Sequence, residues 1–400
     1  RLVVAWGVHV PVVPDNPEAK RKQEAHRAAL LDAIAAYARG PLVRRLGAPG
    51  PPTSVRPATR GVRSLVFLAD FDGFPRVILR ASEGWQRSAR LAYNFRSFAR
   101  LRLPVPKLLA SDLSPLTRLR WGFYLLVERF EHGQHPDDAP DREAATRAVA
   151  RALARFHNVQ KRMWGWPGFP RLGSYRAHFL KRAAASAAKL APTLAAGQTG
   201  PLNAWFREHA VAAPLGHPFS LTHSRINCGN FVVRPDGEAT LVDLVEARYG
   251  CFCPDLISAF DRLCERDERL MSAFLDEYFG GRPAGCRETF EASRPFFEAS
   301  RAVARAGTYA RRIARGPDAP EAPTFRARLQ RHLATFGFHT GERLCAEAAG
   351  TPPNEVQTVA AKRAVASRYF EAARAVQHQV VVKDWTRTGP SEMGLLWVAL

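Results

Sequence analysis

The chain has 400 residues, 46% apolar and 24% charged, and its 58 Lys and Arg against 37 Asp and Glu give a formal net charge of +21. The apolar fraction, with eight Trp and 24 Phe, excludes a mainly disordered or fibrous chain and indicates a globular protein of two or three domains. No apolar run approaches the ~18 residues that span a bilayer. Six cysteines without a C-x-x-C pair favour a reducing, cytoplasmic compartment.

The positive charge favours anionic partners: phosphates, nucleic acid or a membrane surface. The basic residues are scattered and mostly Arg, and no nucleic-acid-binding motif is present. Binding to nucleic acid or to an anionic surface by charge alone, including a location at the periphery of a membrane, therefore stays one alternative. It predicts weak affinity that falls steeply with salt.

The first third of the chain predicts a helix followed by a small sheet. In chain order the expected elements are a helix over residues 16–39, a Pro/Gly linker at 47–52, a hairpin of strands 62–70 and 76–80, a helix over 88–101 and an apolar strand over 122–128. We assign residues 1–54 to an N-terminal helical extension with its linker. Residues 55–128 then form a small β-rich lobe with one helix packed on it.

From residue 142 onward the pattern is mostly helical. Apolar residues at helical spacing predict helices over 142–157, 175–196 and 256–279. We assign residues 129–345 to a larger helical lobe and 346–400 to a C-terminal helix and tail. A β-rich lobe followed by a helical one predicts an α+β, two-lobed architecture.

The segment from residue 221 to residue 243 carries the chemistry. Pro235-Asp-Gly237 is a strong turn signal between two short β-rich runs, which predicts a hairpin. Asn230 lies just before the first strand and Asp243 just after the second, so we expect the two to meet. Their oxygens are the hard ligands that Mg²⁺ uses together with substrate phosphates.

This segment resembles the aminoglycoside phosphotransferase and choline kinase family of the protein-kinase-like fold. The family motif is His-x-Asp-x-x-x-x-Asn, a hairpin and a metal-binding Asp, and His223, Asn230 and Asp243 have its spacing. The acidic residues that follow it in the family are matched by Glu246 and Asp255. The resemblance implies ATP between the lobes, Mg²⁺ on Asn230 and Asp243, and transfer of the γ-phosphate to a hydroxyl group of a small molecule.

The resemblance extends to the small lobe. Gly61 and Ser64 lie where the family has its nucleotide loop, and Arg80 lies on the strand that carries the phosphate-binding cation. Glu128 lies at the hinge against which adenine docks. The helix that should supply a carboxylate partner for that cation contains no Asp or Glu, and Asn94 is the available stand-in.

Besides the missing carboxylate and an Arg in place of the family's phosphate-binding Lys, a third departure from the family lies at the catalytic centre. The family's catalytic Asp is Arg225 here, and a guanidinium that stays protonated cannot accept a proton from the acceptor hydroxyl. Arg225 could pair with Asp243 and fill the space of the Mg²⁺. It could instead receive an anionic substrate or the γ-phosphate, with Glu246 or Asp255 as an unusual base.

The roles of the remaining polar residues are simpler. We favour a structural role for Asp255, which would hold the loop, and for His223, which would orient the loop by hydrogen bonding rather than transfer protons.

Two hypotheses follow. The first is an ATP-dependent small-molecule kinase with a remodelled active site, and the second is an inactive pseudokinase that binds nucleotide or acts as a scaffold. The acceptor is not specified by the sequence. Because a chain at +21 repels polycations, an anionic or neutral small molecule, or one at a lipid surface, fits better than an aminoglycoside.

Overall fold

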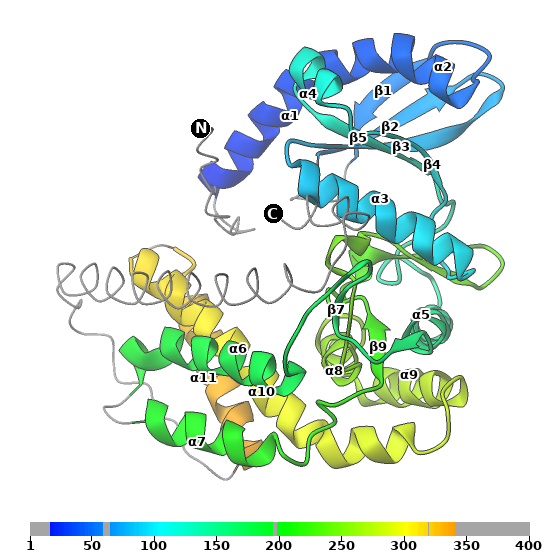
Figure 1. The fold of residues 1–400 in the computed structure, drawn as a ribbon. Helices are drawn as coiled ribbons and strands as arrows, with labels where there is room; N and C mark the ends of the chain where they lie inside the picture. The colour runs from blue at the N-terminus through cyan, green and yellow to red at the C-terminus, as the bar shows by residue number, and fades with distance from the viewer. Residues whose placement is uncertain (1–16, 59–64, 195–197, 319, 341–400) are drawn as a thin grey trace, which may run out of the picture.

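A five-stranded antiparallel sheet and a mainly helical region form the two lobes of the protein (Figure 1). The computed structural model describes residues 17–58, 65–194, 198–318 and 320–340. The predicted α+β, two-lobed arrangement is confirmed, with the β-rich lobe first in the chain. Within these residues no helix is long and apolar enough to cross a bilayer.

The sheet of the small lobe has the strand order β1-β2-β3-β5-β4. Its strands are β1 (Ser54–Pro57), β2 (Leu65–Phe71), β3 (Phe74–Ser82), β4 (Leu108–Asp112) and β5 (Tyr124–Arg129). The predicted hairpin is β2-β3, and Gly73 in its turn has a φ of 67°, a left-handed conformation that glycine adopts without strain. The edge strands β1 and β4 were not predicted, because both are short and lie beside proline-rich segments.

Helices cover both faces of this sheet. They are α1 (Pro17–Tyr37), a π-helical turn (Ala38–Leu42), α2 (Val43–Leu46), α3 (Trp85–Arg100) and α4 (Pro115–Trp121). Successive side chains of a strand point to opposite faces, so Leu125 joins the core that contains Tyr37 of α1 and Leu126 joins the core that contains Phe95 of α3. Tyr37 also donates a hydrogen bond to Asp112 of β4 at 2.6 Å. The predicted N-terminal helix is therefore built into the core of the small lobe.

The large lobe is built from seven α-helices of the described chain. They are α5 (Arg142–His157), α6 (Tyr175–Leu190), α7 (Thr199–His209), α8 (Cys253–Arg262), α9 (Glu268–Gly280), α10 (Cys286–Arg315) and α11 (Ala322–Thr340). The helix predicted over 142–157 has those bounds. The single helix predicted over 256–279 is wrong: Glu265 and Arg266 both have positive φ angles, which break the helix, and Asp267 caps the start of α9.

Short strands position the segment that carries the motif. They are β6 (Gln160–Lys161), β7 (Gly165–Trp166), β8 (Phe169–Pro170), β9 (Phe219–Thr222), β10 (Phe231–Val233), β11 (Ala239–Leu241) and β12 (Arg248–Gly250). The predicted hairpin is β10-β11, in which Phe231 pairs with Leu241. The backbone N–H of Leu241 also bonds the carbonyl of Pro104 in the small lobe at 2.8 Å, which ties the hairpin to the junction of the lobes.

Candidate active site

Asp243 lies between two guanidinium groups. It follows β11 in a left-handed backbone conformation, with φ 59° and ψ 53°. Nη1 of Arg225 donates a hydrogen bond to Oδ2 of Asp243 at 2.9 Å, and Nη1 of Arg80 lies 3.8 Å from Oδ1. The Asp243 side chain is only 17% exposed, so water screens these pairs weakly. Of the alternatives that the sequence left open for Arg225, the structure contains the pairing with Asp243.

The side chain of Asn230 contacts the backbone of Arg225. The side-chain nitrogen Nδ2 of Asn230 donates to the carbonyl oxygen of Arg225 at 2.7 Å, and the Asn230 carbonyl accepts from Val242 N–H at 2.9 Å. The hairpin therefore brings Asn230 into the region of Asp243, and Arg225 contacts both residues. Asn230 is buried, and this bond fixes the loop that carries Arg225.

Arg80 has a carboxylate partner that sequence reasoning did not find. Its Nε donates to Oε1 of Glu128 at 2.7 Å, and both side chains are largely buried. Arg80 on β3 pairs with Leu126 on β5, so Glu128, two residues further along β5, is a diagonal neighbour on the same face. Burial opposes the charge of Arg80, but the carboxylates of Glu128 and Asp243 outweigh it and raise the pKa of Arg80.

Asn94 does not substitute for that carboxylate. Its Nδ2 donates to the backbone carbonyl of Leu244 at 3.0 Å, and the side chain is fully buried. The bond links α3 to the 3₁₀ turn Leu244–Glu246 that follows Asp243. Asn94 thus positions the turn after Asp243, while Glu128 is the residue that pairs with Arg80.

Asp255 organises the loop at the start of the motif. Its carboxylate accepts hydrogen bonds from the backbone N–H groups of His223 at 2.7 Å and Ser224 at 3.0 Å, and from the buried ring of His157 at 3.3 Å. Burial by itself raises the pKa of Asp255, but the hydrogen bond and charge of His157 and the bonds to the loop lower it overall. These contacts give Asp255 the geometry of a structural carboxylate.

His223 lies in the loop before Arg225, and Glu246 lies in the 3₁₀ turn after Asp243. The ring of His223 is buried and its Nε2 bonds the carbonyl oxygen of Val242 at 2.9 Å, which links the loop to the end of β11. Glu246 closes the turn after Asp243, and its charge favours the protonated forms of Arg90 and Arg182. Gly61 and Ser64, the candidate nucleotide-loop residues, lie outside the described residues.

The residues around Asp243 do not fit Mg²⁺ in this arrangement. Oδ1 of Asp243 is buried without a hydrogen-bond partner, which would suit a cation, but Oδ2 is bonded to Arg225 and a second guanidinium faces Oδ1. Two positive groups within 4 Å of the carboxylate repel a divalent cation. Among the described residues, moreover, no group of three or more His, Cys, Asp or Glu side chains could hold a metal ion.

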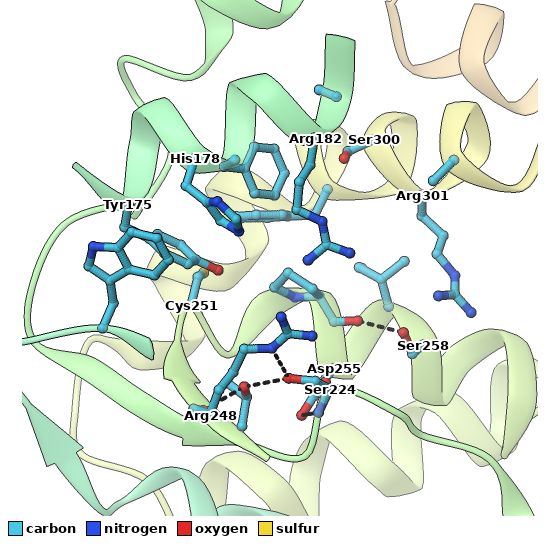
Figure 2. Close-up of a pocket in the computed structure, with 18 of the residues that line it drawn as sticks. Tyr175, His178, Arg182, Ser224, Arg248, Cys251, Asp255, Ser258, Ser300 and Arg301 are labelled. Atoms are coloured by element: carbon cyan, nitrogen blue, oxygen red, sulfur yellow. Dashed lines mark hydrogen bonds between the residues drawn. The ribbon is translucent and has the colours of Figure 1, made fainter. Parts of the chain in front are cut away.

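A cavity of about 220 Å³ opens in the large lobe beside the motif. Figure 2 shows Ser224 and Asp255 on one side of it, with Arg182 of α6 pointing into it from the opposite side and Arg248 of β12 next to Ser224. Sequence reasoning missed this cavity, because its arginines are scattered along the chain. The cluster Trp164-Gly-Trp166, which supplies an aromatic wall, was the available signal.

The fold is that of the kinase-like phosphotransferases. A choline/ethanolamine kinase family protein from Mesorhizobium loti matches with a TM-score of 0.54 at 19% identity, over 78% of this chain and 98% of that one. A candidate aminoglycoside phosphotransferase from Ralstonia eutropha JMP134 matches with a TM-score of 0.54 at 16% identity, over 79% and 99%. The ADP-bound aminoglycoside phosphotransferase APH(2'')-Ib matches with a TM-score of 0.51 at 13% identity, over 78% and 99%.

At these identities the matches establish the fold alone. A family model described as the phosphotransferase enzyme family matches residues 54–289, more than half of the chain. The chain therefore belongs to the phosphotransferase enzyme family, as the motif spacing predicted. A comparison with curated protein sequences gives no match.

Proposed function

We propose that this protein binds a nucleotide between its lobes and acts as a small-molecule phosphotransferase with a remodelled, slow active site. Membership of the phosphotransferase enzyme family supports the reaction class. The ADP bound to a neighbour of the same fold supports a nucleotide site, for which Gly61, Ser64, Arg80 and Glu128 are the proposed residues. In the reaction the γ-phosphorus would exchange its bond to ADP for one to the acceptor oxygen, whose proton leaves to solvent.

The observation that carries the proposal is the pair between Arg225 and Asp243. We propose that the fixed charge of Arg225 takes the place that a metal charge would have beside the phosphates. Phosphoryl transfer depends mainly on positioning and on stabilising charge, so a guanidinium can support it. Without a carboxylate base at this position, the rate should be lower by about 10²–10⁴.

The same pair also favours a second candidate function, an inactive nucleotide-binding pseudokinase. Here Asp243 serves only to hold Arg225, and the protein acts as a binding or scaffolding module. Both functions place the protein in the cytoplasm, which the free thiols of buried Cys251 and Cys253 support. Both also keep the proposed boundary between the two lobes after residue 128.

The test measures nucleotide binding and turnover separately. We expect ATP to raise the melting temperature in EDTA, and ADP to form with a panel of hydroxylated organic anions. If ATP binds but no acceptor yields ADP, the pseudokinase function is the correct one. If ATP with or without Mg²⁺ neither binds nor turns over, both functions are overturned.

The variant Arg225→Asp separates the two functions further. In a pseudokinase with an otherwise competent site, this change should create Mg²⁺-dependent phosphotransfer that the parent lacks. In a working remodelled enzyme, it should abolish the parent's activity. Arg225→Lys keeps the charge and serves as the matched control.

A further inference from the structure

The cavity in the large lobe contains an unusual concentration of positive charge. Arg171, Arg182 and Arg248 line it, and within the described residues none of the three forms an ion pair with a carboxylate. Burial and then the charge of Arg248 lower the pKa of Arg182, and the same two causes lower the pKa of Arg171. Three like charges thus face one space, and the charge of Glu246 offsets only part of the effect on Arg182.

The positive charge of these arginines also acts on a neighbouring histidine, His178. His178 lines the cavity beside Arg182 (Figure 2). Burial, followed by the charges of Arg171, Arg182 and Arg248, lowers the pKa of His178 to about 4. At neutral pH the ring is therefore an uncharged hydrogen-bonding group within a positive cavity.

The acidic residue among those that line the cavity, Asp255, is already engaged elsewhere. Asp255 bonds the backbone of His223 and Ser224, on the side of the loop. Arg301 also lines the cavity, but its Nε donates to Asp261 at 2.9 Å, so its charge is paired. Among the described residues Arg171, Arg182 and Arg248 form no ion pair, although Nε of Arg248 donates to the Ser224 hydroxyl at 3.0 Å. Their guanidinium groups can therefore receive an anionic ligand.

One wall of the cavity is aromatic. Trp164, Trp166 and Tyr175 line it. The guanidinium of Arg171 lies 4.6 Å from the ring centre of Trp166 and 5.5 Å from that of Trp164, and Arg90 also lies over Trp166, at 4.5 Å. These cation–π contacts hold the indole rings in place. The parts of the two indole rings that line the cavity give it an apolar wall next to the cluster of charge.

We propose that this cavity binds a small organic anion, in which a phosphate or carboxylate group is attached to a flat apolar part. Arg182 and Arg248 hold the anion, since a guanidinium bonds both oxyanions through paired N–H groups. Trp164 and Trp166 contact the apolar part. The assignment deepens the proposed function, because this ligand is the acceptor whose hydroxyl reaches the motif past Ser224.

Calorimetric titration without nucleotide tests the proposal, with phenyl phosphate as the probe. We expect saturable binding of phenyl phosphate, and binding of benzyl alcohol and benzylamine at least tenfold weaker. Arg182→Gln and Arg248→Gln should each weaken phenyl phosphate binding by about tenfold, the loss expected for one charge-assisted contact. Arg176→Gln, on the same helix but outside the cavity lining, should leave the affinity within twofold.

Equal binding of benzylamine and phenyl phosphate would overturn the proposal, as would unchanged affinity in Arg182→Gln. Arg182 reaches into the cavity but stays partly accessible to solvent, and it forms no ion pair among the described residues, so this variant should fold even if Arg248→Gln does not. Inorganic phosphate serves as a probe without an aromatic part and should bind more weakly than phenyl phosphate. ATP binding measured on the same samples distinguishes failure of this inference from failure of the proposed function. If the protein binds ATP but not phenyl phosphate, only this inference is contradicted.

Discussion

Nη1 of Arg225 donates a hydrogen bond to Oδ2 of Asp243 at 2.9 Å. The two residues are 18 positions apart, and the β10-β11 hairpin between them brings them together. The pair joins the two positions that the motif spacing predicts for a catalytic carboxylate and for a metal ligand. The proposed function depends on whether this ion pair persists when a nucleotide binds.

Replacing Arg225 with Gln should make nucleotide binding depend on Mg²⁺. The change removes the charge that occupies Oδ2 of Asp243 and leaves a carboxylate available to a hard cation. We expect the parent to bind ATP equally in EDTA and in Mg²⁺, and Arg225→Gln to bind at least tenfold more tightly with Mg²⁺. Fluorescence titration of labelled ATP measures both. Identical Mg²⁺ dependence in parent and variant would contradict the proposed role of Arg225.

Removing Glu128 should destabilise the small lobe. Glu128→Leu leaves Arg80 buried with only the more distant Asp243 to compensate its charge, and breaking a buried pair in this way costs about 3 kcal/mol. Urea denaturation measures the change in free energy of unfolding. The double variant Arg80→Leu/Glu128→Leu should be more stable than Glu128→Leu alone, because no uncompensated charge remains. If the double variant is the less stable of the two, the pair is not the source of the effect.

Stability should decrease as the pH falls from 8 to 5. Burial lowers the pKa of His157 below the ordinary value of about 6.5, so in this range the unfolded chain binds a proton that the native state does not. The pKa of Asp255 is also lowered, and its contribution is lost only as the pH falls below about 4. We expect the urea midpoint to fall with pH, with a smaller slope in His157→Gln. An equal slope in the variant would exclude His157 as a source of the dependence.

The titration of His178 should respond to the cavity arginines. In the parent its ring proton resonance should shift with a midpoint near pH 4, because burial and the arginine charges oppose protonation. Arg182→Gln removes one of those charges and should raise the midpoint toward 6.5. NMR titration measures this directly, and Arg176→Gln provides the control. A midpoint that is the same in all three proteins would show that the guanidinium of Arg182 does not act on His178.

Much of the fold could be predicted from local patterns. The alternation of apolar residues around Asp72 and Gly73 predicted β2-β3, and the turn at 235–237 predicted β10-β11, because turn chemistry and side-chain period are properties of neighbouring residues. The same approach failed at residues 263–267. There the apolar spacing continues through a break that two left-handed residues create, and periodicity alone does not reveal a backbone dihedral angle.

The site could be predicted only in part. The spacing of His223, Asn230 and Asp243 identified the family. The absence of acidic residues around Asn94 showed that this helix does not supply a carboxylate partner for Arg80. The actual partner, Glu128, lies 48 residues from Arg80 and meets it only through the pairing of β3 with β5. Strand register depends on the whole sheet, so this contact could not be read from the sequence.

The sequence by itself determined the class of protein and its anomaly: a phosphotransferase motif in which Arg225 stands at the position of an acid. Tertiary structure decided what that arginine does, because an ion pair requires two side chains within about 4 Å and the chain alone does not specify that distance. Tertiary structure also decided where part of the positive charge is concentrated. Arg171 and Arg182 are separated from Arg248 by more than 60 residues, and only the tertiary structure brings the end of β8, α6 and β12 to one cavity.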